Sequence, residues 1–411
     1  MTMAQREAAS SRLRGLPAYL FEALVRTRVA TEKRGVDVID LSIGDPDLGA
    51  PQVVVESLRR HAEDSRLHSY TPPWVVERFC RAAASWFKKR YGIDLDSERE
   101  VCPVVGTKEG LAHLPLAVID PGNLALVPDP GYPVYSRSVA FAGGEVEYLP
   151  LSEKNRFLPD LGALRGKRPR LVFLNYPNNP TSATADLGFY GGIVEWAGES
   201  GAYLVSDAAY AEVTFDGDRC PSLLQARGAM DLAIEFHSFS KTFSMAGWRV
   251  GFAAGNAGLV GALRNLKSNI DSGVFGPILL ASVAALEDGW AWYESSMKEY
   301  GLRREIVLKG LDDCGIEYLQ SSATLYVWAK VPGGWSRGCA PGCAKAGASG
   351  SLSMDFAQML LEETGVLVAP GVGFGAQGEG YVRISITCPT PRVKAAVARL
   401  AECSRSWPAR R

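Results

Sequence analysis

Apolar and polar positions alternate along most of the chain in a way that predicts strands interleaved with helices. Apolar positions spaced three and four apart over 17–34 predict an amphipathic helix, and VIDLSIG (38–44) predicts a short strand after it. From Val101 to Asn256, short apolar runs bounded by Gly, Pro or Asp alternate with helical stretches. The runs are ALVPD (125–129), RLVFLNY (170–176), AYLVSDAAY (202–210), IEFHSFS (234–240) and RVGFAAGN (249–256). This alternation is typical of an α/β fold with a doubly wound or mixed, mostly parallel sheet.

The pattern changes after Pro277, where 278–311 predicts one or two long amphipathic helices interrupted near Asp288-Gly289. Three strand-like runs and one helical run then predict a smaller α+β lobe: 324–331, 366–370, 381–387 and 355–365. The segment 333–353 is rich in Gly, Ala and Ser, so we expect a flexible insertion there. We therefore expect three parts: an N-terminal arm with part of the small domain (1–50), a large domain (51–285) and a C-terminal small domain (286–411).

Charge and cysteine usage exclude several classes of partner. The chain carries 44 Lys and Arg against 45 Asp and Glu, so we expect a small-molecule substrate and neither nucleic acid nor a membrane as partner. The eight cysteines are dispersed, and the pair Cys339 and Cys343 does not complete a tetrahedral site, so we expect no metal. The absence of a leader pattern or a long apolar run predicts a soluble cytoplasmic protein.

The strongest chemical signal is HSFSKTFSMAGWRVG (237–251), in which a strand runs into Lys241 and Arg249 follows. This stretch resembles the lysine motif of fold-type I aminotransferases, which use pyridoxal 5′-phosphate (PLP). The resemblance implies a large PLP-binding domain with a smaller α+β domain, and it makes Lys241 the catalytic amine that carries the cofactor as a Schiff base. It also makes Ser238, Ser240 and Arg249 ligands of the cofactor phosphate.

Two further motifs resemble the same family. In LVSDAAYAEVTF (204–215), the resemblance makes Asp207 the catalytic partner of the cofactor's pyridine nitrogen and Tyr210 a hydrogen-bond donor to its phenolic oxygen. In NYPNNPTS (175–182), Asn179 matches the asparagine that contacts that oxygen and borders the substrate. Family members usually carry glycine where this chain has Ser182, so we expect a difference in the turn geometry or in the nearby substrate space.

Two motifs in the first half of the chain complete the cofactor set. VVGTKEGLAHLPLAVI (104–119) places Gly106, Thr107 and Lys108 where a strand meets a helix, and amides at such an N-terminus bind phosphate. Downstream, PDPGYPVY (128–135) contains Tyr132, which by resemblance stacks on the pyridine ring.

The expected substrate contacts come from the two ends of the chain. In GYVRISIT (380–387), Arg383 matches the arginine that binds the substrate α-carboxylate through two hydrogen bonds, and an amino acid substrate follows from that role. Gly44, in LSIGDPD, is expected to contact the same carboxylate.

The chain most resembles LL-diaminopimelate aminotransferases, which implies a role in amino acid metabolism and biosynthesis. The resemblance also implies a homodimer in which Tyr70 reaches the cofactor phosphate of the neighbouring subunit. It departs from them near Val75 and Cys80, where the family usually has glycine and arginine, and we expect these changes at the substrate entrance.

The main hypothesis is a PLP-dependent transaminase for an acidic or dibasic amino acid. An alternative is β- or γ-elimination, replacement or cyclisation on an amino acid such as S-adenosylmethionine. A non-catalytic PLP-fold binding protein is the third alternative.

Overall fold

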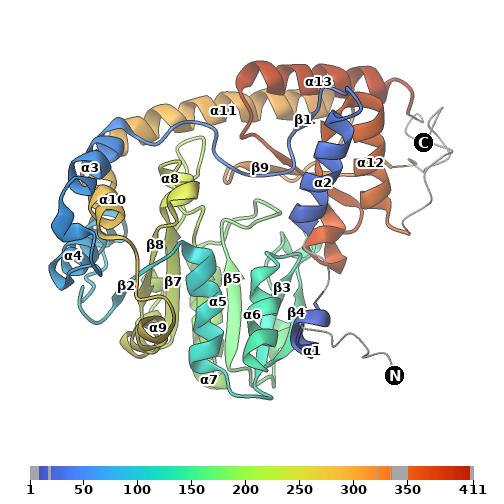
Figure 1. Cartoon of the computed structure of the whole chain (residues 1–411). Coiled ribbons are helices and arrows are strands. Elements are labelled where there is room, and N and C mark those ends of the chain that lie inside the picture. Colours follow the sequence, from blue (N-terminus) through green and yellow to red (C-terminus); the bar gives the residue numbers. More distant parts are fainter. Residues whose placement is uncertain (1–8, 17–19, 321, 334, 336–349, 408–411) are drawn as a thin grey trace, which may run out of the picture.

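A seven-stranded sheet forms the centre of the molecule (Figure 1). The computed structural model describes residues 9–16, 20–320, 322–333, 335 and 350–407. Across the sheet the strands lie in the order β2 (Val101–Val104), β8 (Gly251–Gly255), β7 (Ala233–Ser238), β6 (Tyr203–Asp207), β5 (Leu171–Asn175), β3 (Leu124–Asp129) and β4 (Glu145–Pro150). All neighbours pair in parallel except β8, which runs antiparallel to both β7 and β2. The predicted mixed, mostly parallel sheet is confirmed.

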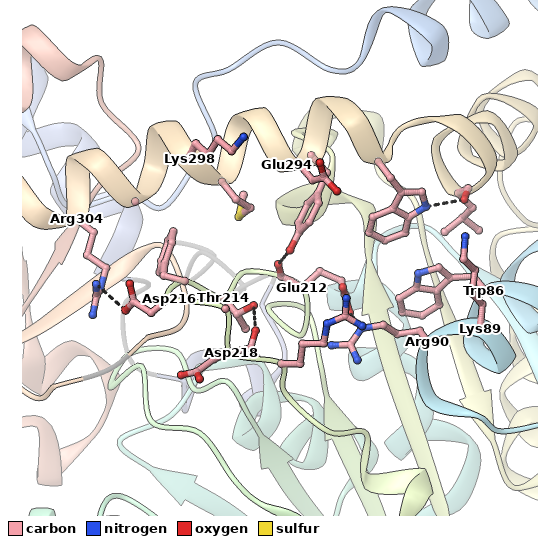
Figure 2. Close-up of a pocket in the computed structure, with 18 of the residues that line it drawn as sticks. Trp86, Lys89, Arg90, Glu212, Thr214, Asp216, Asp218, Glu294, Lys298 and Arg304 are labelled. Atoms are coloured by element: carbon pink, nitrogen blue, oxygen red, sulfur yellow. Dashed lines mark hydrogen bonds and ion pairs between the residues drawn. The ribbon is translucent and has the colours of Figure 1, made fainter.

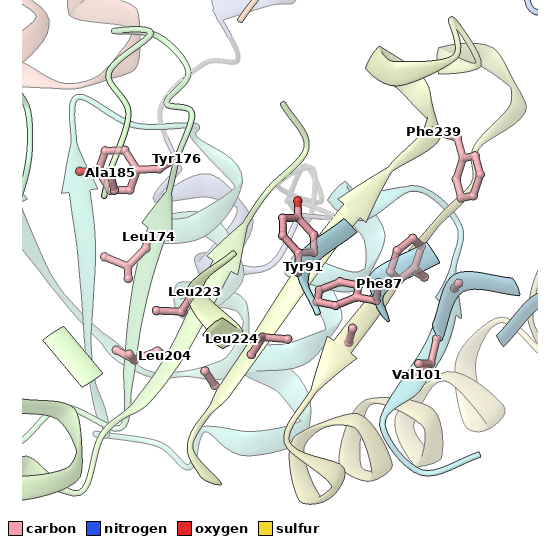
Figure 3. Packing of buried hydrophobic residues seen from close by; sticks show 14 of the residues in the cluster. Phe87, Tyr91, Val101, Leu174, Tyr176, Ala185, Leu204, Leu223, Leu224 and Phe239 are labelled. Atoms are coloured by element: carbon pink, nitrogen blue, oxygen red, sulfur yellow. The ribbon is translucent and has the colours of Figure 1, made fainter. Parts of the chain in front are cut away.

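Helices cover both faces of this sheet, because its strands are apolar on both sides. Along β5, Leu171 and Phe173 belong to one buried cluster, while Val172 and Leu174 belong to the opposite one. The first cluster is closed by α5 (Thr107–Val118), α6 (Val134–Ala142) and α9 (Ala257–Ile270). The second is closed by α4 (Pro73–Tyr91), α7 (Leu187–Ser200) and α10 (Gly276–Asp288), and Figure 3 shows part of it. This period of two is typical of strands buried between two helical layers.

The C-terminal part packs as a separate layer with its own buried cluster. Its three-stranded antiparallel sheet has the order β11 (Ala369–Pro370), β12 (Tyr381–Ser385) and β9 (Tyr326–Lys330), and β1 (Ile39–Asp40) pairs in parallel with β10 (Val366–Leu367). The long α11 (Trp290–Asp313) runs beside α13 (Thr390–Ser404), and α12 (Leu352–Thr364) packs below them (Figure 1). The remaining helices are α1 (Ser11–Arg14), α2 (Leu20–Glu32), α3 (Gln52–Ala62) and α8 (Phe239–Thr242).

Most predicted elements are found close to their expected bounds. The interruption of the long helical run is confirmed, because Gly289 ends α10 and precedes α11. The predicted strands 38–44 and 366–370 are shorter than expected, since the first forms only β1 and the second divides into β10 and β11. The boundaries after residues 50 and 285 remain predictions. Most of the predicted insertion, including Cys339 and Cys343, lies outside the described residues. Among the helices that are described, none is both long and apolar enough to cross a bilayer.

The contact between α11 and α13 depends on a glycine. A Cβ atom on Gly310 would lie 2.2 Å from Cγ1 of Val397, so Gly310→Ala is expected to lower the free energy of unfolding by about 1–3 kcal/mol. Gly261 in α9 is a matched control, because no atom lies within 4 Å of a Cβ built there. Gly261→Ala should therefore raise the free energy of unfolding by roughly 0.5–1 kcal/mol. Denaturant titration measures both changes, and equal stability of the two variants would contradict this packing.

Candidate active site

A cavity of about 360 Å³ lies at one edge of the central sheet. The predicted site residues that line it are Gly44, Thr107, Lys108, Tyr132, Asn179, Asp207, Tyr210, Ser238, Ser240, Lys241, Arg249 and Arg383. Ile43, Ala209, Ala246 and Tyr326 complete the lining. Residues from distant parts of the sequence therefore meet in one place.

Strand direction explains this convergence. Asp207 ends β6, Lys241 follows β7, and Asn179 follows β5, so these parallel strands deliver their side chains to the same edge. Thr107 lies just beyond the end of β2, which points the same way. Arg249 precedes β8, and because β8 is antiparallel its beginning lies at this edge as well.

The amine of Lys241 is held at the cavity wall. Its Nζ donates a hydrogen bond to the carbonyl oxygen of Gly44 at 2.5 Å. Burial of the ammonium lowers the pKa of Lys241 below its ordinary value, while the nearby Tyr326 and Asp45 oppose that shift. A lysine with a lowered pKa has a larger neutral fraction at neutral pH, which is the form that attacks a carbonyl group.

The carboxylate of Asp207 is buried opposite two donors. Oδ2 accepts a hydrogen bond from the hydroxyl of Tyr135 at 2.7 Å, and Oδ1 accepts one from the amide of Ala209 at 3.2 Å. Asn175 Nδ2 fixes the backbone by donating to the carbonyl oxygen of Asp207 at 2.7 Å. Burial raises the pKa of Asp207 to about 6, and the Tyr135 hydrogen bond partly offsets that rise. A buried carboxylate of this kind gains most from a cationic partner in the cavity.

Donors suited to an anion gather around Gly106. This residue precedes α5 with φ +72°, and the end of the helix has no side-chain cap. A Cβ atom on Gly106 would lie 2.5 Å from Nη2 of Arg249, so the guanidinium lies directly against the helix N-terminus. Ser238 accepts a hydrogen bond from the amide of Ser240 at 3.1 Å beside them. Helix amides, hydroxyls and an arginine together form a suitable phosphate site.

Arg383 is almost fully buried between two aromatic rings. Its Cζ lies 4.0 Å from the ring centroid of Tyr326 and 4.7 Å from that of Phe374. Nη1 donates to Oδ1 of Asn179 at 2.6 Å, and Nη2 donates to the carbonyl oxygen of Ser42 at 2.6 Å. Buried guanidinium groups of this kind bind carboxylates strongly, because two parallel hydrogen bonds match the planar fork.

Comparison with known proteins identifies the family. The family model described as Aminotransferase class I and II matches residues 36–400. The chain belongs to this family. Its fold is that of the fold-type I aminotransferases, and the enzyme is a PLP-dependent transferase. The alternatives of β- or γ-elimination, replacement or cyclisation, and of a non-catalytic binding protein, are not favoured by these matches.

Individual relatives match this aminotransferase over nearly the whole chain. An LL-diaminopimelate aminotransferase from Desulforudis audaxviator is 44% identical over 397 residues, 96% of this chain and 97% of that protein. The substrate-bound structure of BacF from Bacillus subtilis superposes with a TM-score of 0.88 at 33% identity, covering 98% of each chain. A probable N-succinyldiaminopimelate aminotransferase from Thermus thermophilus gives a TM-score of 0.85 at 32% identity, covering 93% of this chain and all of that one.

The cavity of the aminotransferase fits PLP. Its volume lies within the range of about 300–1,000 Å³ that small-molecule sites occupy. The amine of Lys241 suits the cofactor aldehyde, the carboxylate of Asp207 suits the ring nitrogen, and the donors around Gly106 and Arg249 suit the phosphate. The residues around the cavity therefore fit this cofactor.

The structure also changes the interpretation of several residues. Tyr70 does not line the cavity, and 86% of its surface is exposed. The expectation that Val75 and Cys80 alter the substrate entrance is wrong, because both lie in the hydrophobic core on the buried side of α4. Ser182 does adopt the left-handed conformation that usually requires glycine, with φ +64°.

Sequence reasoning missed two residues of the aminotransferase site. Tyr135 bonds to Asp207, and it lies three residues after Tyr132 in the same motif. Tyr326 lines the cavity from β9, where its apolar surroundings in the sequence predict only a strand. The register between β9 and β12 was the missing signal, because it alone brings Tyr326 beside Arg383.

A larger cavity of about 1070 Å³ lies elsewhere, between α11, α4 and the loop after Tyr210 (Figure 2). None of the predicted site residues lines it. Two pairs of its charged lining residues are ion pairs, with Arg90 2.9 Å from Glu212 and Arg304 3.3 Å from Asp216. We therefore assign the chemistry of the aminotransferase to the smaller cavity.

A possible metal-ligand cluster is occupied by a lysine. Glu109, His113 and Asp271 approach one another closely enough for one ion. Nζ of Lys267 lies 3.0 Å from Glu109 and 2.8 Å from Asp271, so one ammonium already bridges these two carboxylates. The cluster ties α5 to α9 beside the anion site.

The raised pKa of Asp207 predicts how stability changes with pH. Burial raises this pKa from 3.8 to about 6, so the folded, cofactor-free enzyme binds the proton more tightly than the unfolded chain does. The contribution to folding stability is therefore full below pH 3.8 and is lost as the pH rises to about 6. Above that pH the buried, ionised carboxylate of Asp207 lowers the free energy of unfolding.

Asp207→Asn is expected to stabilise the cofactor-free enzyme at pH 8 by about 1–3 kcal/mol, because the amide is never ionised. The same variant should lose activity by about a hundredfold or more, since Asp207 is the expected anionic partner of the cofactor's ring nitrogen. Denaturation of the cofactor-free proteins at pH 5 and pH 8 measures the first effect. A variant that is less stable than the parent at pH 8 would contradict this assignment.

Proposed function

We propose that this aminotransferase transfers the α-amino group of LL-diaminopimelate, or of a similar acidic or dibasic amino acid, to a keto acid. The observation that carries the proposal is the placement of Lys241, Asp207 and Arg383 around one cavity. The relatives named for LL-diaminopimelate, 42–44% identical over almost the whole chain, support this choice of substrate.

The proposed roles follow from the contacts of each side chain. Arg383 binds the α-carboxylate, and Asn179, which accepts from Arg383, orients it. With PLP bound, the amine of Lys241 would move the proton away from the substrate Cα, and burial favours its neutral form by lowering its pKa. Asp207 holds a proton at the ring nitrogen, and Tyr210 donates to the phenolic oxygen. When bound, PLP supplies the carbonyl group and the electron sink for this chemistry.

The remaining predicted residues hold the cofactor. Ser238, Ser240 and Arg249, with the amides of Gly106, Thr107 and Lys108, are proposed to bind the phosphate. Tyr132 is proposed to stack on the ring, and Gly44 to leave room for the substrate carboxylate. Tyr70 is too exposed to serve its own cavity, which supports a homodimer in which it reaches the phosphate site of the partner.

The first experiment is a spectral titration of the purified holoenzyme with LL-diaminopimelate, glutamate, leucine and S-adenosylmethionine, without any keto acid. We expect LL-diaminopimelate to convert the bound cofactor to pyridoxamine phosphate in a single stoichiometric turnover, and leucine to leave it unchanged. Adding a keto acid should restore the original spectrum, because transamination alternates between two half-reactions.

Lys241→Ala is the control for this titration, and it should lose the visible absorbance of the lysine-linked cofactor together with all turnover. Repeated turnover of S-adenosylmethionine without a keto acid would refute transamination and support elimination or cyclisation. Full activity in Lys241→Ala would remove Lys241 from its role.

Subunit complementation tests the shared site. Tyr70→Ala and Lys241→Ala homodimers should each be inactive or nearly so. In a mixed dimer, one site combines the native Lys241 of one chain with the native Tyr70 of the other. Unfolding and refolding an equal mixture should therefore restore roughly a quarter of the parent activity, since about half of the dimers are mixed and each has one intact site. No recovery, in a mixture shown by tagged chains to contain mixed dimers, would contradict the proposed role of Tyr70.

A further inference from the structure

Tyr326 lies at the centre of the site although no motif predicts a role for it. Its hydroxyl lies 2.7 Å from the hydroxyl of Tyr210, and the two rings meet at 64° with centroids 5.5 Å apart. Both side chains are buried, at 6% and 5% exposure. Two hydroxyls this close in a dry site form a directed pair, in which one donates and the other accepts.

The ring of Tyr326 also supports Arg383. Arg383 pairs with Trp328 across β9 and β12, so Tyr326 is its diagonal neighbour on the same face of that sheet. The guanidinium lies between this ring and Phe374, which is the stacked geometry that guanidinium groups favour. The hydroxyl of Tyr326 therefore contacts Tyr210, while its ring packs against Arg383.

Gly44 makes room for Tyr326. A Cβ atom at position 44 would lie 2.0 Å from the hydroxyl oxygen of Tyr326, which no rotation of a packed ring can relieve cheaply. The carbonyl oxygen of Gly44 in turn accepts from Lys241 Nζ. Tyr326 thus borders the lysine as well as Tyr210 and Arg383.

A strained pair of residues fixes the backbone of Tyr326. Ser182 and Thr324 both have left-handed φ angles, +64° and +69°, a conformation that is costly for side chains with a Cβ and more so for β-branched ones. Their hydroxyls lie 2.6 Å apart, and Ser182 Oγ also donates to the carbonyl oxygen of Tyr326 at 2.9 Å. With glycine at 182, these hydrogen bonds would not exist.

We propose that Tyr326 is a positioning residue that orients the Tyr210 hydroxyl toward the cofactor and supports Arg383, and that Ser182 and Thr324 hold Tyr326 in place. The proposal rests on the proposed function, in which Tyr210 donates to the phenolic oxygen of PLP. For Tyr210 to donate there, its own oxygen must accept from Tyr326. A donor that also accepts a hydrogen bond is a stronger donor.

Other ionisable groups surround the Tyr210–Tyr326 pair, and the variants described below do not substitute them. They are Lys241, Asp45, Asp207, Arg249 and Arg383. Since a stronger donation from Tyr210 stabilises the deprotonated, lysine-linked cofactor, removing the Tyr326 hydroxyl should raise the pH at which its visible absorbance changes.

The test is a pH titration of the absorbance of the holoenzyme for the parent, Tyr326→Phe and Tyr326→Leu. Tyr326→Phe is expected to raise the midpoint by roughly 0.5 to 1 pH unit, as the loss of one hydrogen bond would, and to leave KM for the amino donor unchanged. Tyr326→Leu should give the same midpoint and, in addition, raise KM roughly three- to tenfold, because Arg383 loses its supporting ring. Tyr318→Phe, which removes an exposed hydroxyl bonded to Asp312, is the matched control and should change neither quantity.

Two variants of Ser182 separate positioning from strain. Ser182→Ala keeps the left-handed backbone and loses the hydrogen bonds, whereas Ser182→Gly loses the bonds and relieves the strain. Both should raise the midpoint by less than Tyr326→Phe does, and the shifts should not add in the double variants. An unchanged midpoint in Tyr326→Phe refutes the role of Tyr326, and fully additive shifts refute that of Ser182. A parent enzyme without any lysine-linked absorbance would instead refute the proposed function itself.

Discussion

The site depends on the partial burial of one lysine amine in the wall of a cavity. Burial disfavours the charged form of every ionisable group, so the same cavity lowers the pKa of Lys241 and raises the pKa values of Asp207 and Tyr210. A base, an acid and a phenol are all moved toward their neutral forms in one place. This arrangement is costly for an empty cavity and favourable once a ligand with complementary charges enters it.

The surrounding structure is organised to bear that cost. Hydrogen bonds from Tyr135 and Ala209 hold the Asp207 carboxylate, and neutral oxygens and two aromatic rings hold Arg383. These partners come from both layers of the molecule, since Tyr135 lies on α6 and Ala209 follows β6, whereas Tyr326 lies on β9. Arg383 is bonded to Asn179, so the residue proposed to bind the substrate carboxylate is linked directly to the turn after β5. Cofactor and substrate groups therefore form one connected polar network inside an apolar shell.

The sequence predicts much of this arrangement, because its key residues follow recognisable strands. Apolar runs and their Gly, Pro or Asp boundaries locate β3, β5, β6, β7 and β8, and the ends of these strands carry Asn179, Asp207 and Lys241. The break at Gly289 is equally readable. The surroundings of side chains are not predicted correctly. Val75 and Cys80 are expected at the substrate entrance, but both point from α4 into the hydrophobic core. The sequence does not identify Tyr326 and Tyr135 as site residues, because their contacts arise from strand register and tertiary packing, which no local sequence pattern reveals.

The antiparallel strand β8 has a consequence for how the molecule is assembled. Because β8 returns beside β7, Lys241 and Arg249 lie in one short connection between neighbouring strands, and closing such a loop costs little chain entropy. Arg383 joins them only through pairing of β12 with β9, near the other end of the chain. Domains tend to fold as the N-terminal part leaves the ribosome. A nascent chain complete through Gly255 already contains Lys241, Asp207 and Arg249, the residues proposed to hold the cofactor, whereas Arg383, which is proposed to bind the substrate, has yet to be synthesised.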